Sequence, residues 1–230
     1  MSAVPRIVEV RKNVLKHNDE VARALRQRFE EAGLFVVSLV SSPGSGKTAF
    51  LEKTLTLLRE AGFRPAAVVG DLATDNDAAR LARSQAPVKQ ITTGTLCHLE
   101  AAMIQAAVEG WNLAGLDFLF IENVGNLVCP SAYDLGENLR LVLLSVTEGE
   151  DKPLKYPTIF NSADLAVVTK MDLAEAAGFD GEAARLNIRA VRPGIPIIEL
   201  SSKSGDGMND WMAMLISRRK SARPATASAV

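Results

Sequence analysis

Short apolar segments alternate along this chain with longer segments in which apolar residues recur every three or four positions. The short segments are typical of buried strands and cover residues 34–40, 64–70, 88–91, 118–121, 139–146, 163–169 and 195–200. Helical spacing predicts helices over 10–32, 49–61, 76–85, 96–111, 183–189 and 208–217. This alternation predicts an α/β fold with a doubly wound, mainly parallel sheet of about seven strands flanked by helices.

The composition and charge of the chain limit the classes of protein to which it can belong. The chain has 230 residues, 47% hydrophobic and 23% charged, which is enough for one large domain with a sizeable core. A net charge of −1 gives no electrostatic reason to expect nucleic acid or membrane partners. The apolar runs are too short to span a bilayer, the amino terminus lacks a signal-peptide core, and two cysteines make no disulfide framework. We therefore expect a cytoplasmic protein that binds neither nucleic acid nor membrane.

Residues 41–48, Ser-Ser-Pro-Gly-Ser-Gly-Lys-Thr, stand between the strand at 34–40 and the helix at 49–61. This strand–loop–helix context is that of a phosphate-binding P-loop, although Ser41 replaces the usual first glycine. We expect Lys47 to reach the β- and γ-phosphates and the Thr48 hydroxyl to bind Mg²⁺. The residues whose backbone should cradle the phosphates are Gly44, Ser45 and Gly46.

A second motif selects the nucleotide. Thr169-Lys170-Met171-Asp172 ends the strand at 163–169, and the Asp172 carboxylate can pair with two guanine N–H groups that adenine lacks. Lys170 can cover the purine face, and Thr169 stands where asparagine is usual, so we expect at most a roughly tenfold loss of guanine affinity. Ligands bind at the carboxyl ends of parallel strands, so GTP and its product GDP are the expected nucleotides. The loop expected behind the base contains Ser201, Ser202 and Lys203.

Hydrolysis of GTP needs a metal ion and a positioned water more than covalent chemistry. Asp71 and Glu122 each end a strand. We expect Thr48 and Asp71 to bind Mg²⁺ directly, and Glu122 to lie next to these ligands without binding the ion. Gly125 would sense the γ-phosphate through its N–H group. We expect Asp75 to orient the attacking water, with helix capping as its alternative role. We assign residues 34–219 to one P-loop GTPase domain, 1–33 to an amino-terminal helix packed on it, and 220–230 to a flexible tail.

Both cysteines belong to segments that carry further polar residues. Cys97 and His98 are adjacent, and Thr95 can cap a helix that would place Cys97 in the positive potential of its first turn. Cys129 follows shortly after the expected γ-phosphate sensor. Thiolate and imidazole suit Ni²⁺ or Zn²⁺, although buried free cysteines are also ordinary core residues. Three ligands leave a four-coordinate site incomplete, and a symmetric dimer would complete it.

Five segments together resemble the nickel-insertion accessory GTPases of hydrogenase maturation. They are the P-loop, a switch I segment at 70–78, two metal-ligand segments at 94–99 and 124–130, and the segment 149–157. The resemblance runs from about residue 10 to residue 218. It implies a slow GTPase that forms a GTP-dependent homodimer and binds Ni²⁺ or competing Zn²⁺ at Cys97, His98 and Cys129. It also implies that Lys152 or Lys155 reaches nucleotide across the dimer.

The expected partners are the hydrogenase large subunit, as nickel acceptor, and a small zinc-containing accessory protein. Some members of the family carry an amino-terminal Cys-rich or His-rich nickel site, but residues 1–40 here hold no cysteine and one histidine, His17. Three alternatives remain. The urease accessory GTPases share the fold and the mechanism, but they place a proline between the ligand Cys and His, whereas Cys97 and His98 are adjacent here. The second alternative is a GTPase that serves another cofactor enzyme and has structural cysteines. The third is a metal-binding module with a vestigial nucleotide site.

Overall fold

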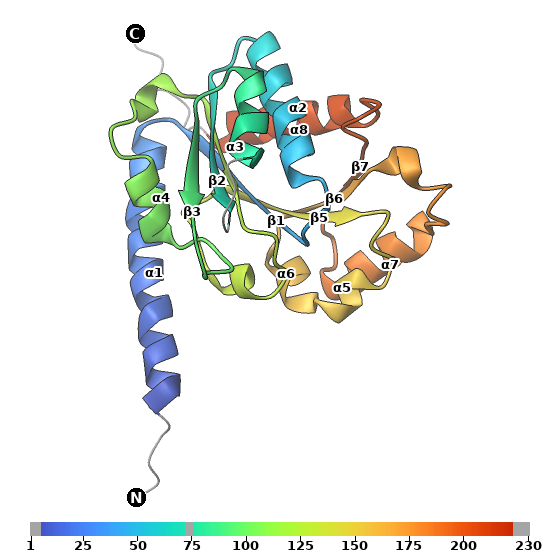
Figure 1. Ribbon diagram of the computed structural model, residues 1–230, viewed down its shortest axis with the longest axis horizontal. Coiled ribbons are helices and arrows are strands. Elements are labelled where there is room, and N and C mark those ends of the chain that lie inside the picture. The colour runs from blue at the N-terminus through green and yellow to red at the C-terminus, as the bar shows by residue number, and fades with distance from the viewer. Residues whose placement is uncertain (1–5, 72–75, 223–230) are drawn as a thin grey trace, which may run out of the picture.

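A computed structural model describes residues 6–71 and 76–222, and its centre is a sheet of seven parallel strands (Figure 1). The strand order is β3-β2-β4-β1-β5-β6-β7, which reverses direction on either side of β1, as in a doubly wound fold. This confirms the predicted fold class. The strands are β1 (Phe35–Ser41), β2 (Pro65–Asp71), β3 (Val88–Thr92), β4 (Phe118–Glu122), β5 (Leu139–Ser145), β6 (Leu165–Thr169) and β7 (Ile197–Glu199).

Helices cover both faces of the sheet. Successive residues of β1 point to opposite faces, so Val37 and Leu39 pack among α2, α3 and α8, whereas Val36 packs among α1 and α4. Farther along the second face, α6 and α7 cover β5 and β6. The helices are α1 (Arg6–Glu31), α2 (Lys47–Glu60), α3 (Asn76–Leu81), α4 (Ala101–Ala107), α5 (Lys152–Lys155), α6 (Pro157–Ser162), α7 (Gly181–Val191) and α8 (Met208–Ala222).

One sequence expectation about a helix is wrong, and two short helices were not predicted. The helix expected over 96–111 is confined to α4, because Glu100 is extended and serves as the residue before the first turn. The charged segment near 148–153 is turn up to Asp151, and the short helices α5 and α6 that follow it were not predicted. Pro153 is the second residue of α5 and Pro157 the first residue of α6, positions in the first turn where the missing N–H group costs little. The division into an amino-terminal helix, a main domain and a tail stays a prediction.

None of the helices that the structure describes is long and apolar enough to cross a membrane. The carboxyl ends of β1, β2, β4 and β6 meet at one edge of the sheet, and the residues that follow these strands form the site described next.

Candidate functional site

The P-loop turns sharply out of β1 into α2. Gly44 and Gly46 adopt φ values of +75° and +92°, which a side chain would strain, and α2 begins at the next residue. The Lys47 ammonium donates to Ser41 Oγ at 2.8 Å and to the Ser42 carbonyl at 3.3 Å. Burial lowers the pKa of Lys47. The lysine is therefore held inside the loop, where an anion would relieve its desolvation.

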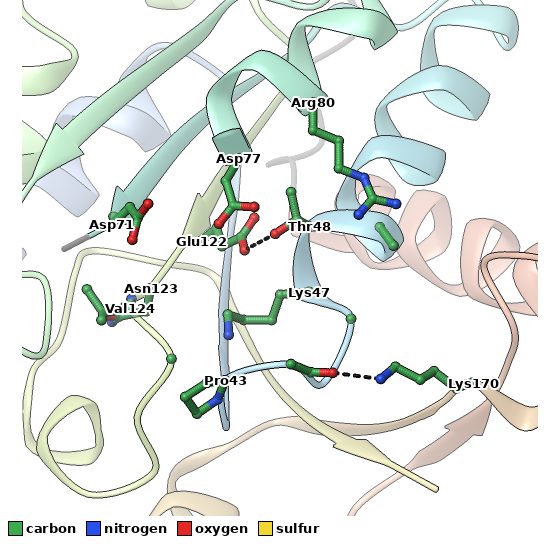
Figure 2. A pocket seen from close by; sticks show the side chains of 15 residues that line it. Pro43, Lys47, Thr48, Asp71, Asp77, Arg80, Glu122, Asn123, Val124 and Lys170 are labelled. Atoms are coloured by element: carbon green, nitrogen blue, oxygen red, sulfur yellow. Dashed lines mark hydrogen bonds between the residues drawn. The ribbon is translucent and has the colours of Figure 1, made fainter. Parts of the chain in front are cut away.

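A cavity of about 500 Å³ opens in front of the P-loop (Figure 2). It brings together predicted residues from four segments, and Asp71 and Gly125 lie in its wall with Lys47 and Thr48. Asp77 and Arg80 also line it, although the sequence analysis did not select them. Their place on α3, within and directly after the expected switch I segment at 70–78, was the available signal. Asp75 lies outside the described residues, so its catalytic role stays a prediction.

Glu122 contacts the expected magnesium ligand directly. Its Oε1 accepts a hydrogen bond from the Thr48 hydroxyl at 2.7 Å, whereas its buried Oε2 has no hydrogen-bond partner among the described residues (Figure 2). Burial raises the pKa of Glu122 to about 7, against the opposing attraction of Lys47. A hydroxyl with carboxylates of Asp71 and Glu122 in one cavity supplies hard oxygen ligands, so the donor set fits Mg²⁺.

Gly125 touches the P-loop. A Cβ atom there would lie 2.9 Å from Pro43 Cα, so no larger residue fits without moving the loop. This close approach brings the backbone of residues 123–125 to the wall of the cavity. The position is the one that a γ-phosphate sensor requires, and the assigned role stays a prediction.

A second cavity, of about 230 Å³, adjoins the first and contains the expected base-binding residues. It is lined by Gly46, Ala49, Thr169, Lys170, Asp172, Leu173, Ser201, Ser202 and Lys203. Asp172 Oδ1 accepts from Ser201 Oγ at 2.6 Å, which joins two of the motifs. The Lys170 ammonium donates to the Gly44 carbonyl at 2.7 Å, so its stem lies beside the P-loop. The structure therefore brings the three predicted nucleotide motifs together.

Thr169 has a contact that sequence alone did not indicate. Its hydroxyl is buried and donates to the Ser45 carbonyl of the P-loop at 2.6 Å. The threonine therefore fastens the base-binding segment to the phosphate-binding segment. A side chain in this role does not need to touch the base itself.

The three predicted metal ligands also meet. The ligand atoms of Cys97, His98 and Cys129 all lie within 4.8 Å of one another, with the two Sγ atoms 3.1 Å apart. His98 Nδ1 lies 4.0 Å from Cys97 Sγ, and the ring packs against Tyr133 in a tilted arrangement with a centroid distance of 4.0 Å. Two thiols and an imidazole form a soft donor set that suits Ni²⁺ or Zn²⁺.

The local setting of Cys97 differs from the expectation. It lies in the loop before α4 and not in a first helical turn, so the helix potential invoked for its thiolate is absent there. Cys129 begins a short 3-10 helix, Cys129–Ala132. On the far side of the imidazole, Glu100 Oε1 lies 3.4 Å from His98 Nε2, which is otherwise buried without a hydrogen-bond partner among the described residues. The carboxylate favours a proton on Nε2 and leaves Nδ1 facing the cysteines.

A P-loop after the central strand, with a nucleotide-sized cavity at the topological switch point, defines a P-loop nucleoside triphosphatase. The family model described as the CobW/HypB/UreG nucleotide-binding domain matches residues 35–199. The chain belongs to the CobW/HypB/UreG family.

Several relatives are similar over nearly the whole chain. The hydrogenase maturation factor HypB of Azotobacter chroococcum mcd 1 is 51% identical over 221 residues, covering 95% of this chain and 71% of the relative. The hydrogenase/urease maturation factor HypB of Helicobacter pylori strain 26695 is 42% identical over 93% of this chain and 88% of its own length. The crystal structure of HypB from Helicobacter pylori in complex with nickel matches with a TM-score of 0.84 and 41% identity, covering 93% of this chain and all of that chain.

Proposed function

We propose that this protein is a GTP-hydrolysing metallochaperone that binds nickel, with zinc as competitor, and drives nickel insertion into the hydrogenase large subunit during maturation. The observation that carries the proposal is the meeting of Cys97, His98 and Cys129 within 4.8 Å, with Cys129 on the loop that continues from the cavity residues 123–125. The names of the similar proteins, hydrogenase maturation factors with one solved as a nickel complex, support the same function.

In this proposal the P-loop and Lys47 bind and orient the triphosphate, and Asp172 selects guanine. Thr48 and Asp71 hold Mg²⁺, with Glu122 accepting from the Thr48 hydroxyl. An ion held by these residues would supply positive charge that stabilises the phosphate groups during transfer. Asp75 orients the water that attacks the γ-phosphorus, and GDP and phosphate leave. Slow turnover suits a switch whose purpose is a timed change of state.

The metal site requires a second copy. Three protein ligands do not complete a tetrahedral or square-planar site, and an isologous dimer would place two sets face to face. We propose a GTP-dependent homodimer with nickel at the interface. Lys152 and Lys155 both lie on α5, where Lys155 pairs with Asp151 at 2.6 Å and Lys152 lies 3.9 Å from Glu148. One of these lysines reaches the partner's nucleotide.

The proposed partners are the hydrogenase large subunit and a small zinc-containing nickel accessory protein. A second candidate client is a urease, because the similar Helicobacter pylori protein is named a maturation factor for both enzymes. Maturation assays with each apoenzyme would separate the two clients. The cytoplasmic location also stays a prediction.

Nickel calorimetry tests the proposal. Titration of Ni²⁺ into the parent protein, with GDP and then with a non-hydrolysable GTP analogue, should show binding that the Cys97→Ala/Cys129→Ala double variant loses. Dimer mass measured alongside should rise with the GTP analogue. Nickel binding of equal strength in the double variant would remove the metal assignment and leave a GTPase with another task.

A further inference from the structure

The loop that carries Cys97 and His98 is fixed at several points by residues of the nucleotide cavity. We propose that Asn123 is a positioning residue that couples the occupancy of the nucleotide site to the geometry of the metal site. The inference rests on the proposed function, since it concerns how one site acts on the other. It goes beyond that function because it assigns the coupling to one side chain that neither binds metal nor belongs to a nucleotide motif.

Asn123 joins the two sites through its amide oxygen. It directly follows β4, its side chain is buried, and it lines the nucleotide cavity. Its backbone N–H donates to the Leu39 carbonyl in β1 at 3.0 Å, which fixes its main chain to the strand leading to the P-loop. Its Oδ1 accepts from Val124 N at 2.9 Å and from Leu99 N at 3.0 Å. One oxygen therefore holds both the sensor loop and the residue after His98.

Leu99 is also fixed by packing. Its side chain is fully buried against Gly70, where an added Cβ would lie 2.8 Å from Leu99 Cγ. Gly70 directly precedes Asp71, and the Asp71 carbonyl accepts from Thr93 N at 2.8 Å. The start and the end of the metal-ligand loop are thus attached to the end of β2. A close-packed contact of this kind transmits displacement, because neither side has space to absorb it.

Asn126 supplies a second connection. Its Nδ2 donates to the Cys97 carbonyl at 3.3 Å, and its Oδ1 accepts from Val128 N at 2.8 Å, next to Cys129. Residues 123–126 therefore contact both cysteine segments. If a γ-phosphate draws Gly125 towards the P-loop, these two asparagines move the metal-ligand segments with it. Thermodynamic reciprocity requires that a bound metal resists the same movement.

The test measures a coupling factor, defined as the ratio of the Ni²⁺ dissociation constants with saturating GDP and with a saturating non-hydrolysable GTP analogue. Saturation removes any change in nucleotide affinity from the comparison. Asn123→Ala should bring this ratio to within about twofold of one, whereas Asn123→Asp, which keeps the acceptor oxygen, should retain more of the parent ratio. The matched control is Asn138→Ala. Asn138 also accepts from a backbone N–H, that of Val36 at 2.8 Å, but lines neither proposed site.

The outcomes separate the inference from the function beneath it. A parent ratio retained in Asn123→Ala, with cysteine-dependent nickel binding intact, overturns the role of Asn123 alone. Identical nickel affinity in both nucleotide states of the parent also overturns it, because no coupling exists to assign. Nickel binding that survives the double cysteine variant overturns the proposed function instead. If Asn123→Ala does not fold by circular dichroism, Asn123→Leu, which fills a similar volume without an acceptor oxygen, takes its place, and a parent ratio retained in that variant overturns the inference.

Discussion

Glu122 is buried at the base of the phosphate cavity, and its ionisation opposes folding when no cation is bound. Its pKa is raised from 4.5 to about 7, chiefly by burial. The native state therefore binds this proton more tightly than the unfolded state, and stability falls as pH rises from about 4.5 through 7. At about 1.4 kcal/mol per pKa unit, the free energy of unfolding that is lost once the pH has risen past 7 totals on the order of 3 kcal/mol.

Replacement of this carboxyl group should remove that part of the pH dependence. We expect Glu122→Gln to be stabilised relative to the parent at pH 8 more than at pH 5, because the amide carries no charge at either pH. Urea denaturation with a chelator and without nucleotide measures this difference. Glu182→Gln, an exposed carboxyl on α7, serves as the control. A parent and a Glu122→Gln variant with parallel stability curves between these pH values would contradict the assignment.

At the scale of elements, Thr169 shows how the end of β6 is joined to the P-loop. Its hydroxyl donates to the Ser45 carbonyl, so loss of the hydroxyl leaves a buried acceptor unpaired. We expect Thr169→Val to weaken the binding of GTP and the binding of GDP equally, by roughly tenfold at most. The reason is that a hydrogen bond contributes about 0.5–1.5 kcal/mol net. Thr169→Ser, which keeps the hydroxyl, should bind nearly as the parent does. Titration with a fluorescent guanine nucleotide checks both, and a loss confined to one nucleotide would contradict a fastening role.

The central strands β1, β4, β5 and β6 could be predicted because each is a short apolar run that is buried on both faces of the sheet. The edge strand β3 is partly exposed and contains Lys89 and Gln90, so its pattern is weaker. The helix prediction was wrong in the segment before α4 because Leu96 and Leu99 continue the apolar spacing of that helix. In the structure the Leu99 N–H is bonded to Asn123, a residue 24 positions away, and Glu100 is extended. The distant Asn123 side chain thus accepts the Leu99 N–H that a helix would use. The local spacing of apolar residues cannot indicate such a contact.

The same limit separates the predicted parts of the candidate site from the rest. The P-loop, the guanine motif and the metal ligands could be proposed because each lies in short segments whose adjacent residues form a recognisable pattern. Asn123, Asn126 and the packing of Leu99 on Gly70 act between segments, so they emerge only when β2 and β4 lie side by side. The connections between the sites are therefore what the structure adds.

At the scale of the whole molecule, apolar residues surround the incomplete metal site. Leu96 and Val128, each next to a ligand cysteine, have 40% and 62% of their surfaces exposed. Burial of both at a two-fold axis would bring two ligand sets together. We expect Val128→Ser to weaken the proposed GTP-dependent dimer by more than about tenfold, because a two-fold axis buries one valine from each copy and each contributes up to roughly 1.5 kcal/mol. Leu186→Ser is the matched control, since Leu186 on α7 is equally exposed at 62%. Sedimentation with a GTP analogue measures the dimer, and equal weakening by both variants would place the interface elsewhere.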